Sequence, residues 1–234
     1  MINNYFKIAW RNLTRNKASA FINIVGLTTG MVVAILIGLW IYDELSFNKY
    51  HKNYSRIGQV MQNQTFNGKV ETWNSQALQL GPELRNVYGS NFKYVIRTAW
   101  TIDHLLSFDE KKLTTRGNYM EPEITEMLTL KMLRGTRNGL KDPGSILLSE
   151  STAKAFFRDE DPINKLMKID NKLNVKVTGV YQDIPHNSSF ADLSFIAPCD
   201  LYMKDGNFEK TVTWGNSWFQ TFAQIVDNTN MARV

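Results

Sequence analysis

The residues best suited to chemistry are three histidines, His51, His104 and His186, and one cysteine, Cys199. Neither an HExxH spacing nor a CxxC pair occurs, so these residues form no recognisable metal site. The Gly-Lys pair at 68–69 lacks the upstream glycines and the following hydroxyl residue of a P-loop. We therefore predict no metal, no cofactor and no catalytic residue, and we do not expect the chain to hydrolyse ATP by itself.

Asp183, His186 and Ser189 bring the side chains of a hydrolase triad into one loop. A triad is recognised by the roles of its members in three dimensions, which this spacing does not establish. A polar turn with Asx-type hydrogen bonds explains the same residues. We interpret the loop as a turn and keep a membrane-anchored hydrolase as the weakest functional hypothesis.

The segment that must position everything else is residues 18–42, which contain no charged side chain. As a helix this run would be roughly 37 Å long at ~1.5 Å per residue, and about 20 apolar residues cross a bilayer. No small-x-small cleavage pattern follows it, so we predict an uncleaved transmembrane helix rather than a signal peptide. A buried core helix, the alternative, is rarely this long and uncharged.

Charges on the two sides of this span predict its orientation. Four basic residues and no acid precede it, whereas Asp43 and Glu44 follow it at once. Because the basic side stays in the cytoplasm, we expect residues 1–17 inside and residues 43–234 outside. Much of the net charge of +5 lies in that basic segment, so the charge does not indicate nucleic-acid binding.

Residues 3–17 are predicted to form a short amphipathic helix that lies in the lipid headgroups, with membrane lipid as its partner. Its apolar residues recur at helical spacing: Tyr5, Phe6, Ala9, Trp10 and Leu13. The expected membrane-interface residues are Trp10, Arg11, Arg15 and Lys17, with Trp40 at the far end of the span. The alternative is a continuation of the transmembrane helix into the cytoplasm.

Small residues recur every fourth position within the span, at Gly26, Gly30, Ala34 and Gly38. Residues four apart share one helix face, and small side chains let another helix approach closely. Glycine is also frequent in transmembrane helices generally. We interpret the stripe as a helix-packing face, which predicts partner helices outside this chain.

The outer part, residues 43–234, mixes strand and helix patterns without regular βα alternation, so we predict an α+β fold. Expected strands are 55–62, 70–73, 94–100, 105–108, 111–115, 146–148, 166–169, 173–181, 190–197 and 219–226, and expected helices are 75–87, 121–128 and 150–157. Ser149 is the predicted N-cap of the last helix, and residues 170–172 are the predicted turn of a hairpin. A single cysteine permits no intrachain disulfide.

Two stretches of the chain resemble MacB/FtsX-type ABC transporter permeases. The first contains FKIAWRNL at 6–13 and LWIYDELSF at 39–47, and the second contains ILLSESTAKAFF at 146–157 and VTGVYQDIPHNSSF at 177–190. The similarity covers nearly the whole chain and is strongest over 6–57 and 145–190. Arg158 stands where the family commonly has glycine, so the turn after Phe157 is expected to differ.

The resemblance implies a non-catalytic permease subunit of the bacterial inner membrane, with a MacB-like periplasmic core domain of two mixed α/β subdomains. It also implies a separate cytoplasmic ABC ATPase, a second permease copy, and export or extrusion of peptides, drugs or lipoproteins. Such permeases have four transmembrane helices, so we expect this chain to be a truncated one. The alternative hypothesis is a single-span, membrane-anchored extracytoplasmic binding or sensor module.

Overall fold

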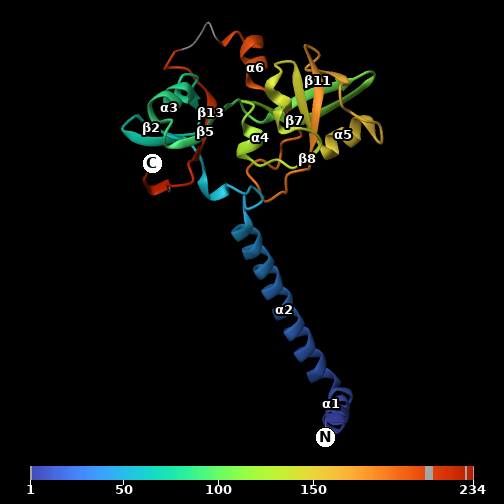
Figure 1. Ribbon diagram of the computed structural model, residues 1–234. Helices are drawn as coiled ribbons and strands as arrows, with labels where there is room; N and C mark the ends of the chain where they lie inside the picture. The colour runs from blue at the N-terminus through green and yellow to red at the C-terminus, as the bar shows by residue number, and fades with distance from the viewer. Residues whose placement is uncertain (1, 209–212, 230, 234) are drawn as a thin grey trace. The chain divides into compact units, whose positions relative to one another are not determined.

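The computed structural model describes residues 2–208, 213–229 and 231–233. The chain divides into two compact units, Met1–Phe47 and Asn48–Val234 (Figure 1). The first unit contains the apolar run and the second contains the mixed helices and strands.

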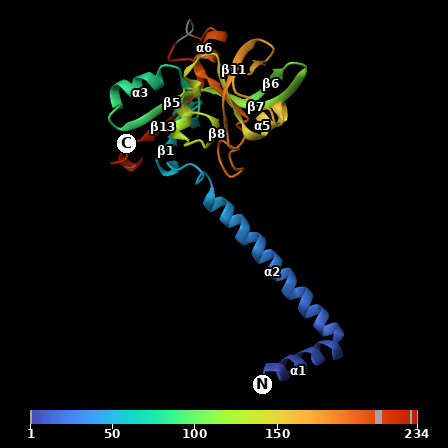
Figure 2. The ribbon, with the colours of Figure 1, turned by 45° about the vertical axis from the view of Figure 1, so that its right-hand side comes forward.

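The first unit consists of helices α1 (Ile2–Arg15) and α2 (Lys17–Ser46), which are separate helices in Figure 2. Asn16 interrupts the helical path with φ −113° and ψ 61°. Among the described residues, α2 is the one helix long and apolar enough to cross a membrane, with a mean hydropathy of 2.3 and no part of its most apolar window buried. It continues past the apolar run through residues 43–46, as the sequence predicted.

The second unit is built around a closed ring of strands. β6 (Ile102–Phe108), β7 (Lys111–Met120), β12 (Phe195–Pro198), β9 (Ser145–Ser149), β11 (Leu173–Tyr181) and β10 (Leu166–Ile169) pair in this order, and β10 pairs back to β6. Alternation places Val175 and Val177 in the core while Lys176 and Thr178 remain half-buried. Helix α5 (Glu150–Phe157) adds Phe156 and Phe157 to the same core.

A second group of strands extends the sheet beyond β7. β13 (Ser217–Ile225) lies between β1 (Ile57–Gln59) and β5 (Phe92–Thr98) and also pairs with β4 (Gln76–Ala77), while α3 (Leu80–Tyr88) packs beside β5. Within the described residues, β5 joins the ring through one registered pair, Thr98 with Met120. The two strand groups therefore share little backbone hydrogen bonding.

Shorter elements complete the described part of the second unit. They are η1 (Tyr54–Arg56), the hairpin β2 (Gln62–Phe66) and β3 (Lys69–Trp73), α4 (Ile124–Met127), β8 (Met132–Gly135), η2 (Arg137–Lys141), α6 (Cys199–Asp205) and η4 (Met231–Arg233). Residues of α4, the segment after it and the outer side of the ring form a second buried apolar cluster. That cluster fills the space between the ring and the second strand group.

The mixed α+β fold with one N-terminal apolar helix is confirmed, and so are several local predictions. Ser149 caps α5 by accepting a hydrogen bond from the Thr152 backbone N–H at 3.3 Å. The turn between β10 and β11 has positive φ at Asp170 (52°) and Asn171 (56°), the requirement of a tight hairpin.

Four element predictions were wrong in detail. The strand predicted over 190–197 is confined to β12 (Phe195–Pro198), because residues 190–192 form a turn. The helix predicted over 75–87 begins only at Leu80, because Gln76 and Ala77 form a strand on β13. The helix predicted over 121–128 is confined to Ile124–Met127. The strand predicted over 55–62 is divided between η1, β1 and the start of β2. In each case the segment pairs with a distant strand or forms a short turn, instead of the element that its local sequence favours.

Candidate coupling site

The chain enters the second unit through a compact set of hydrogen bonds, which we call the junction clasp: Asn48, His51, Ser188 and Ser189. Asn48 donates its backbone N–H to the Asn187 carbonyl at 2.8 Å and its side-chain amide N–H to Ser189 Oγ at 3.0 Å. The Ser189 backbone N–H returns a bond to Asn48 Oδ1 at 2.8 Å. Hydrogen bonds therefore hold both the backbone and the side chain of Asn48, the first residue of the unit.

His51 is the buried centre of the clasp, with 2% of its surface exposed. Its Nδ1 lies 2.8 Å from the Leu128 carbonyl and its Nε2 lies 3.0 Å from Ser188 Oγ. A carbonyl only accepts, so Nδ1 carries the hydrogen and Nε2 accepts from the Ser188 hydroxyl. Tyr50 and Phe190 pack edge-on against the ring.

The charge state of His51 follows from this environment. Burial lowers the pKa of His51, and the hydrogen bond to the Leu128 carbonyl opposes that change only in part. The imidazole is therefore neutral at neutral pH. A neutral ring can donate to the Leu128 carbonyl and accept from the Ser188 hydroxyl. A protonated ring would instead place a positive charge in the clasp without a counter-charge.

The loop that carries Ser188 and Ser189 is fixed at its other end to α5. Asp183 accepts a hydrogen bond from the Ser151 backbone N–H at 3.0 Å and another from the Ser151 hydroxyl. Burial acts to raise the pKa of Asp183, but the hydrogen bonds from Ser151 and Ser149 and the charge of Lys154 together outweigh it and leave that pKa below its usual value. The loop therefore connects the first turn of α5 to the point where the chain enters the unit.

These partners bear on the triad considered from the sequence. The Asp183 carboxylate is engaged by Ser151, and the Ser189 hydroxyl accepts from Asn48. A nucleophile needs a base within hydrogen-bond reach that is itself oriented by a third group. Asp183 and Ser189 belong instead to two separate structural contacts, which supports the interpretation of this loop as a structural turn.

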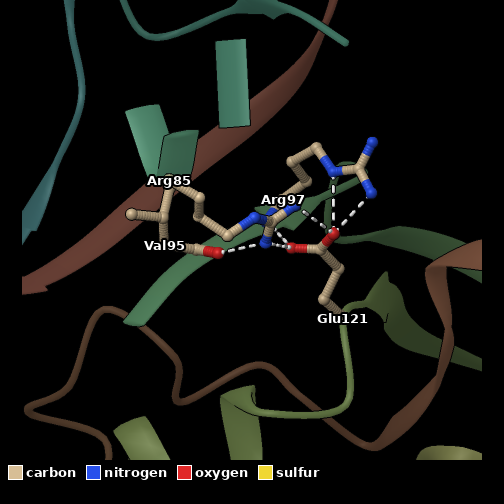
Figure 3. A network of polar contacts seen from close by, with 4 residues as sticks. All are labelled: Arg85, Val95, Arg97 and Glu121. Atoms are coloured by element: carbon tan, nitrogen blue, oxygen red, sulfur yellow. Dashed lines mark hydrogen bonds and ion pairs between the residues drawn. The ribbon is translucent and has the colours of Figure 1, made fainter. Parts of the chain in front are cut away.

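A second polar centre joins the two strand groups, as Figure 3 shows. Glu121, directly after β7, is 7% exposed. Arg85 of α3 donates to both of its carboxylate oxygens, at 2.9 and 3.1 Å. Arg97 of β5 donates its backbone N–H at 2.9 Å and its Nε–H at 2.8 Å. Glu121 thus fixes α3 and β5 to the end of a ring strand.

Electrostatics keep this centre ionised. Burial acts to raise the pKa of Glu121, but the hydrogen bond from Arg85 and the charge of Arg97 outweigh it, so the pKa lies below its ordinary value. The bond to Glu121 raises the pKa of Arg85 correspondingly. Because the two strand groups share one registered backbone pair within the described residues, this ionic centre is a principal connection between them.

The residues proposed from sequence for the membrane helices all lie in the first unit. Trp10 is 71% exposed and Trp40 is 64% exposed, and Arg11, Arg15 and Lys17 are exposed as well. A Cβ built at Gly26, Gly30 or Gly38 would meet no described atom within 4 Å, and Ala34 is exposed. Both proposed faces are therefore uncovered by the described part of this chain.

Sequence reasoning missed both polar centres. His51 was weighed only as a metal ligand, although Tyr50-His51 and the loop 183–190 belong to the two family-like stretches. Arg85, Arg97 and Glu121 lie far apart in the sequence and match no motif. A signal was available, because acidic and arginine side chains at the ends of apolar strands need charged partners when they are buried.

Comparison with known proteins places this geometry in a family. A family model described as the MacB-like periplasmic core domain matches residues 20–234. No curated protein sequence matched the chain. A solved domain of a putative permease protein from Porphyromonas gingivalis is similar, with a TM-score of 0.62 and 21% identity over 78% of each chain. The periplasmic region of MacB from Actinobacillus actinomycetemcomitans has a TM-score of 0.56 and 17% identity, covering 76% of this chain and 78% of that one. At these identities the solved structures support the fold.

Proposed function

The chain belongs to the family of MacB-like periplasmic core domains, and from this premise we propose that it transmits motion from a cytoplasmic ABC ATPase to an extracytoplasmic domain. Domains of this kind are non-catalytic parts of ABC-type transporter permeases. The junction clasp is the observation that carries the proposal. It fixes the first residues after α2 to the body of the domain at Asn48 and His51.

The clasp suits force transmission because its bonds reach several parts of the domain. His51 contacts the carbonyl of Leu128, after α4, and the hydroxyl of Ser188. The loop 183–190 continues that connection through Asp183 to the first turn of α5, which packs on the ring core. A displacement of α2 would therefore move the loop and α5 together rather than only the adjoining residues.

The membrane part of the proposal rests on α1 and α2. We propose that α2 crosses the bacterial inner membrane, that α1 lies in the headgroups of the cytoplasmic leaflet, and that residues 43–234 lie outside the cytoplasm. The apolar run of α2 has the required length, and the basic residues lie on the side that membrane proteins keep inside. The uncovered stripe of Gly26, Gly30, Ala34 and Gly38 is proposed to contact helices of a partner, including a second permease copy.

We propose export or extrusion of peptides, drugs or lipoproteins as the process that this motion serves. This sequence contains no P-loop, which supports an ATPase outside it as the proposed source of the energy. A stand-alone binding or sensor module anchored by one span is the competing function. The two proposals differ in whether an ATPase is bound.

Purification from native membranes tests this proposal. The full chain carries an affinity tag and is cross-linked in the native host before detergent extraction, and co-purifying proteins are identified by mass spectrometry. We expect an ABC ATPase to be enriched. A matched control keeps residues 48–234 and replaces α1 and α2 with an unrelated apolar helix, and it should lose the ATPase. Absence of any ABC ATPase from the native sample would contradict the proposal and favour the binding module.

A further inference from the structure

A pocket of about 250 Å³ opens beside the junction clasp, between the two strand groups. Its polar lining comes from Gln59 of β1, Gln220 of β13, Asn118 of β7 and Thr101 of the β5–β6 connection. Asn48 and Ser189 of the clasp complete its polar wall. The pocket therefore touches the junction clasp and strands of both groups.

Asn118 orders one wall of the pocket. Asn118 is 1% exposed, and its side-chain N–H groups donate to the Ala99 carbonyl at 3.2 Å and to Thr101 Oγ1 at 3.0 Å. Those bonds fix the orientation of the amide, because the carbonyl can only accept. Its Oδ1 has no hydrogen-bond partner among the described residues. This oxygen is closed to the solvent, so the amide serves the pocket by holding Thr101 in its wall rather than by contacting a ligand.

The chemistry of the wall selects a class of ligand. No lining side chain in the described pocket is charged, so a charged ligand would lose its solvation without gaining a counter-charge. Amides and hydroxyls that both donate and accept suit a ligand with many hydroxyl groups. Phe190 and Phe222, whose ring centroids lie 5.3 Å apart, supply an apolar patch for ring C–H groups.

We infer that this pocket binds an uncharged sugar ring, whose hydroxyl groups exchange hydrogen bonds with the side-chain amides of Gln59 and Gln220 and with the Thr101 hydroxyl. The volume corresponds to on the order of eight water molecules at ~30 Å³ each, which accommodates a single pyranose. The ligand would contact Asn48 and Ser189 directly, so occupancy would be sensed at the clasp. The inference goes beyond the transport proposal and does not depend on it.

Ligand-observed NMR on the full chain tests this site. The protein is kept in a phosphocholine detergent, because glucoside and maltoside detergents carry sugar headgroups that would compete. N-acetylglucosamine is the probe, and we expect saturable binding with Kd on the order of 1 mM, the affinity usual for a ligand of this size. Glucosamine, which is cationic, is expected to bind at least about 10-fold more weakly, because no lining side chain of the described pocket offers a counter-charge.

Variants localise the binding. Gln59→Ala and Gln220→Ala each remove a lining amide from a strand whose backbone pairing stays intact, and each is expected to weaken binding at least about 3-fold, the value of one modest hydrogen bond. Gln64→Ala on β2 is the matched control, because Gln64 is exposed and does not line the pocket. Near-UV circular dichroism checks that each variant is folded.

Three outcomes would overturn the inference. The first is no saturable binding to the native chain, which would mean that water alone occupies the pocket. The second is binding that Gln59→Ala and Gln220→Ala leave unchanged. The third is equally tight binding of N-acetylglycinamide, which would show recognition of an amide without a sugar.

Discussion

Replacing His51 with alanine removes the centre of the junction clasp. Two hydrogen bonds are lost, each contributing about 1 kcal/mol, and the buried Leu128 carbonyl is left without its donor at about 1–3 kcal/mol. The contacts of the ring with Tyr50 and Phe190 are lost as well. We expect the free energy of unfolding of the outer domain to fall by about 3 kcal/mol.

Thermal unfolding of the full chain in detergent, followed by near-UV circular dichroism, measures this loss. At about 2–4 °C per kcal/mol for a domain of this size, the midpoint should fall by about 6–12 °C. His51→Asn should recover part of the loss, because its amide N–H can reach the Leu128 carbonyl. Lys52→Ala, an exposed neighbour, should change the midpoint by less than about 2 °C. A fall of less than 2 °C for His51→Ala would refute the assignment of His51 to a stabilising clasp.

The same residue predicts how stability depends on pH. The pKa of His51 is lowered in the folded state, so the unfolded chain takes up a proton first as the pH falls. The contribution of the neutral ring is therefore present above pH ~6.5, the unfolded pKa, and is lost as the pH falls below it. His51→Ala should remove this part of the pH dependence, and an unchanged slope between pH 7 and pH 5 would argue against a buried neutral imidazole.

The remaining predictions concern other sites. Glu121→Gln should lower the free energy of unfolding by about 3 kcal/mol, because it leaves Arg85 and Arg97 without their carboxylate. The control Glu123→Gln, at an exposed residue, should have little effect. Equal unfolding midpoints for the two variants would contradict the connection of the two strand groups through Glu121. Arg158→Gly should raise stability by about 1 kcal/mol, because Arg158 has φ 53° and ψ −111°, and Arg158→Ala, which keeps a Cβ, should not. Gly30→Leu should reduce recovery of a cross-linked permease partner while the midpoint of the outer domain stays unchanged, and undiminished recovery would argue against the packing face.

Local features of this fold were predictable from the sequence because neighbouring residues determine them. The apolar run alone indicates α2, and Asp170-Asn171 indicates the β10–β11 hairpin because both residues tolerate positive φ. The helix predicted after the Ser149 N-cap has the observed bounds of α5. Arg158, noted as a departure from the family's glycine, does adopt a positive φ.

Long-range features were not predictable by the same reasoning. β13 pairs with β1 although more than 150 residues separate them, and such pairing leaves no periodic trace in either segment. Gln76 and Ala77 illustrate the consequence, since a helical pattern was overridden by a strand partner far along the chain. The Glu121 centre also depends on long-range contacts. α3, β5 and β7 must come together before Arg85 and Arg97 can reach the Glu121 carboxylate.

Sidedness of the two units across the membrane is the most direct test of the account. Cys199 is the single cysteine and is buried, and burial raises its thiol pKa to about 12, so the native chain should react little with maleimide. Ser90→Cys and Asn4→Cys place one exposed thiol in the outer domain and one in α1. In intact spheroplasts an impermeant maleimide should label Ser90→Cys fully and Asn4→Cys only after lysis. Labelling of Asn4→Cys before lysis, with Ser90→Cys protected, would contradict the proposed orientation and the coupling role built on it.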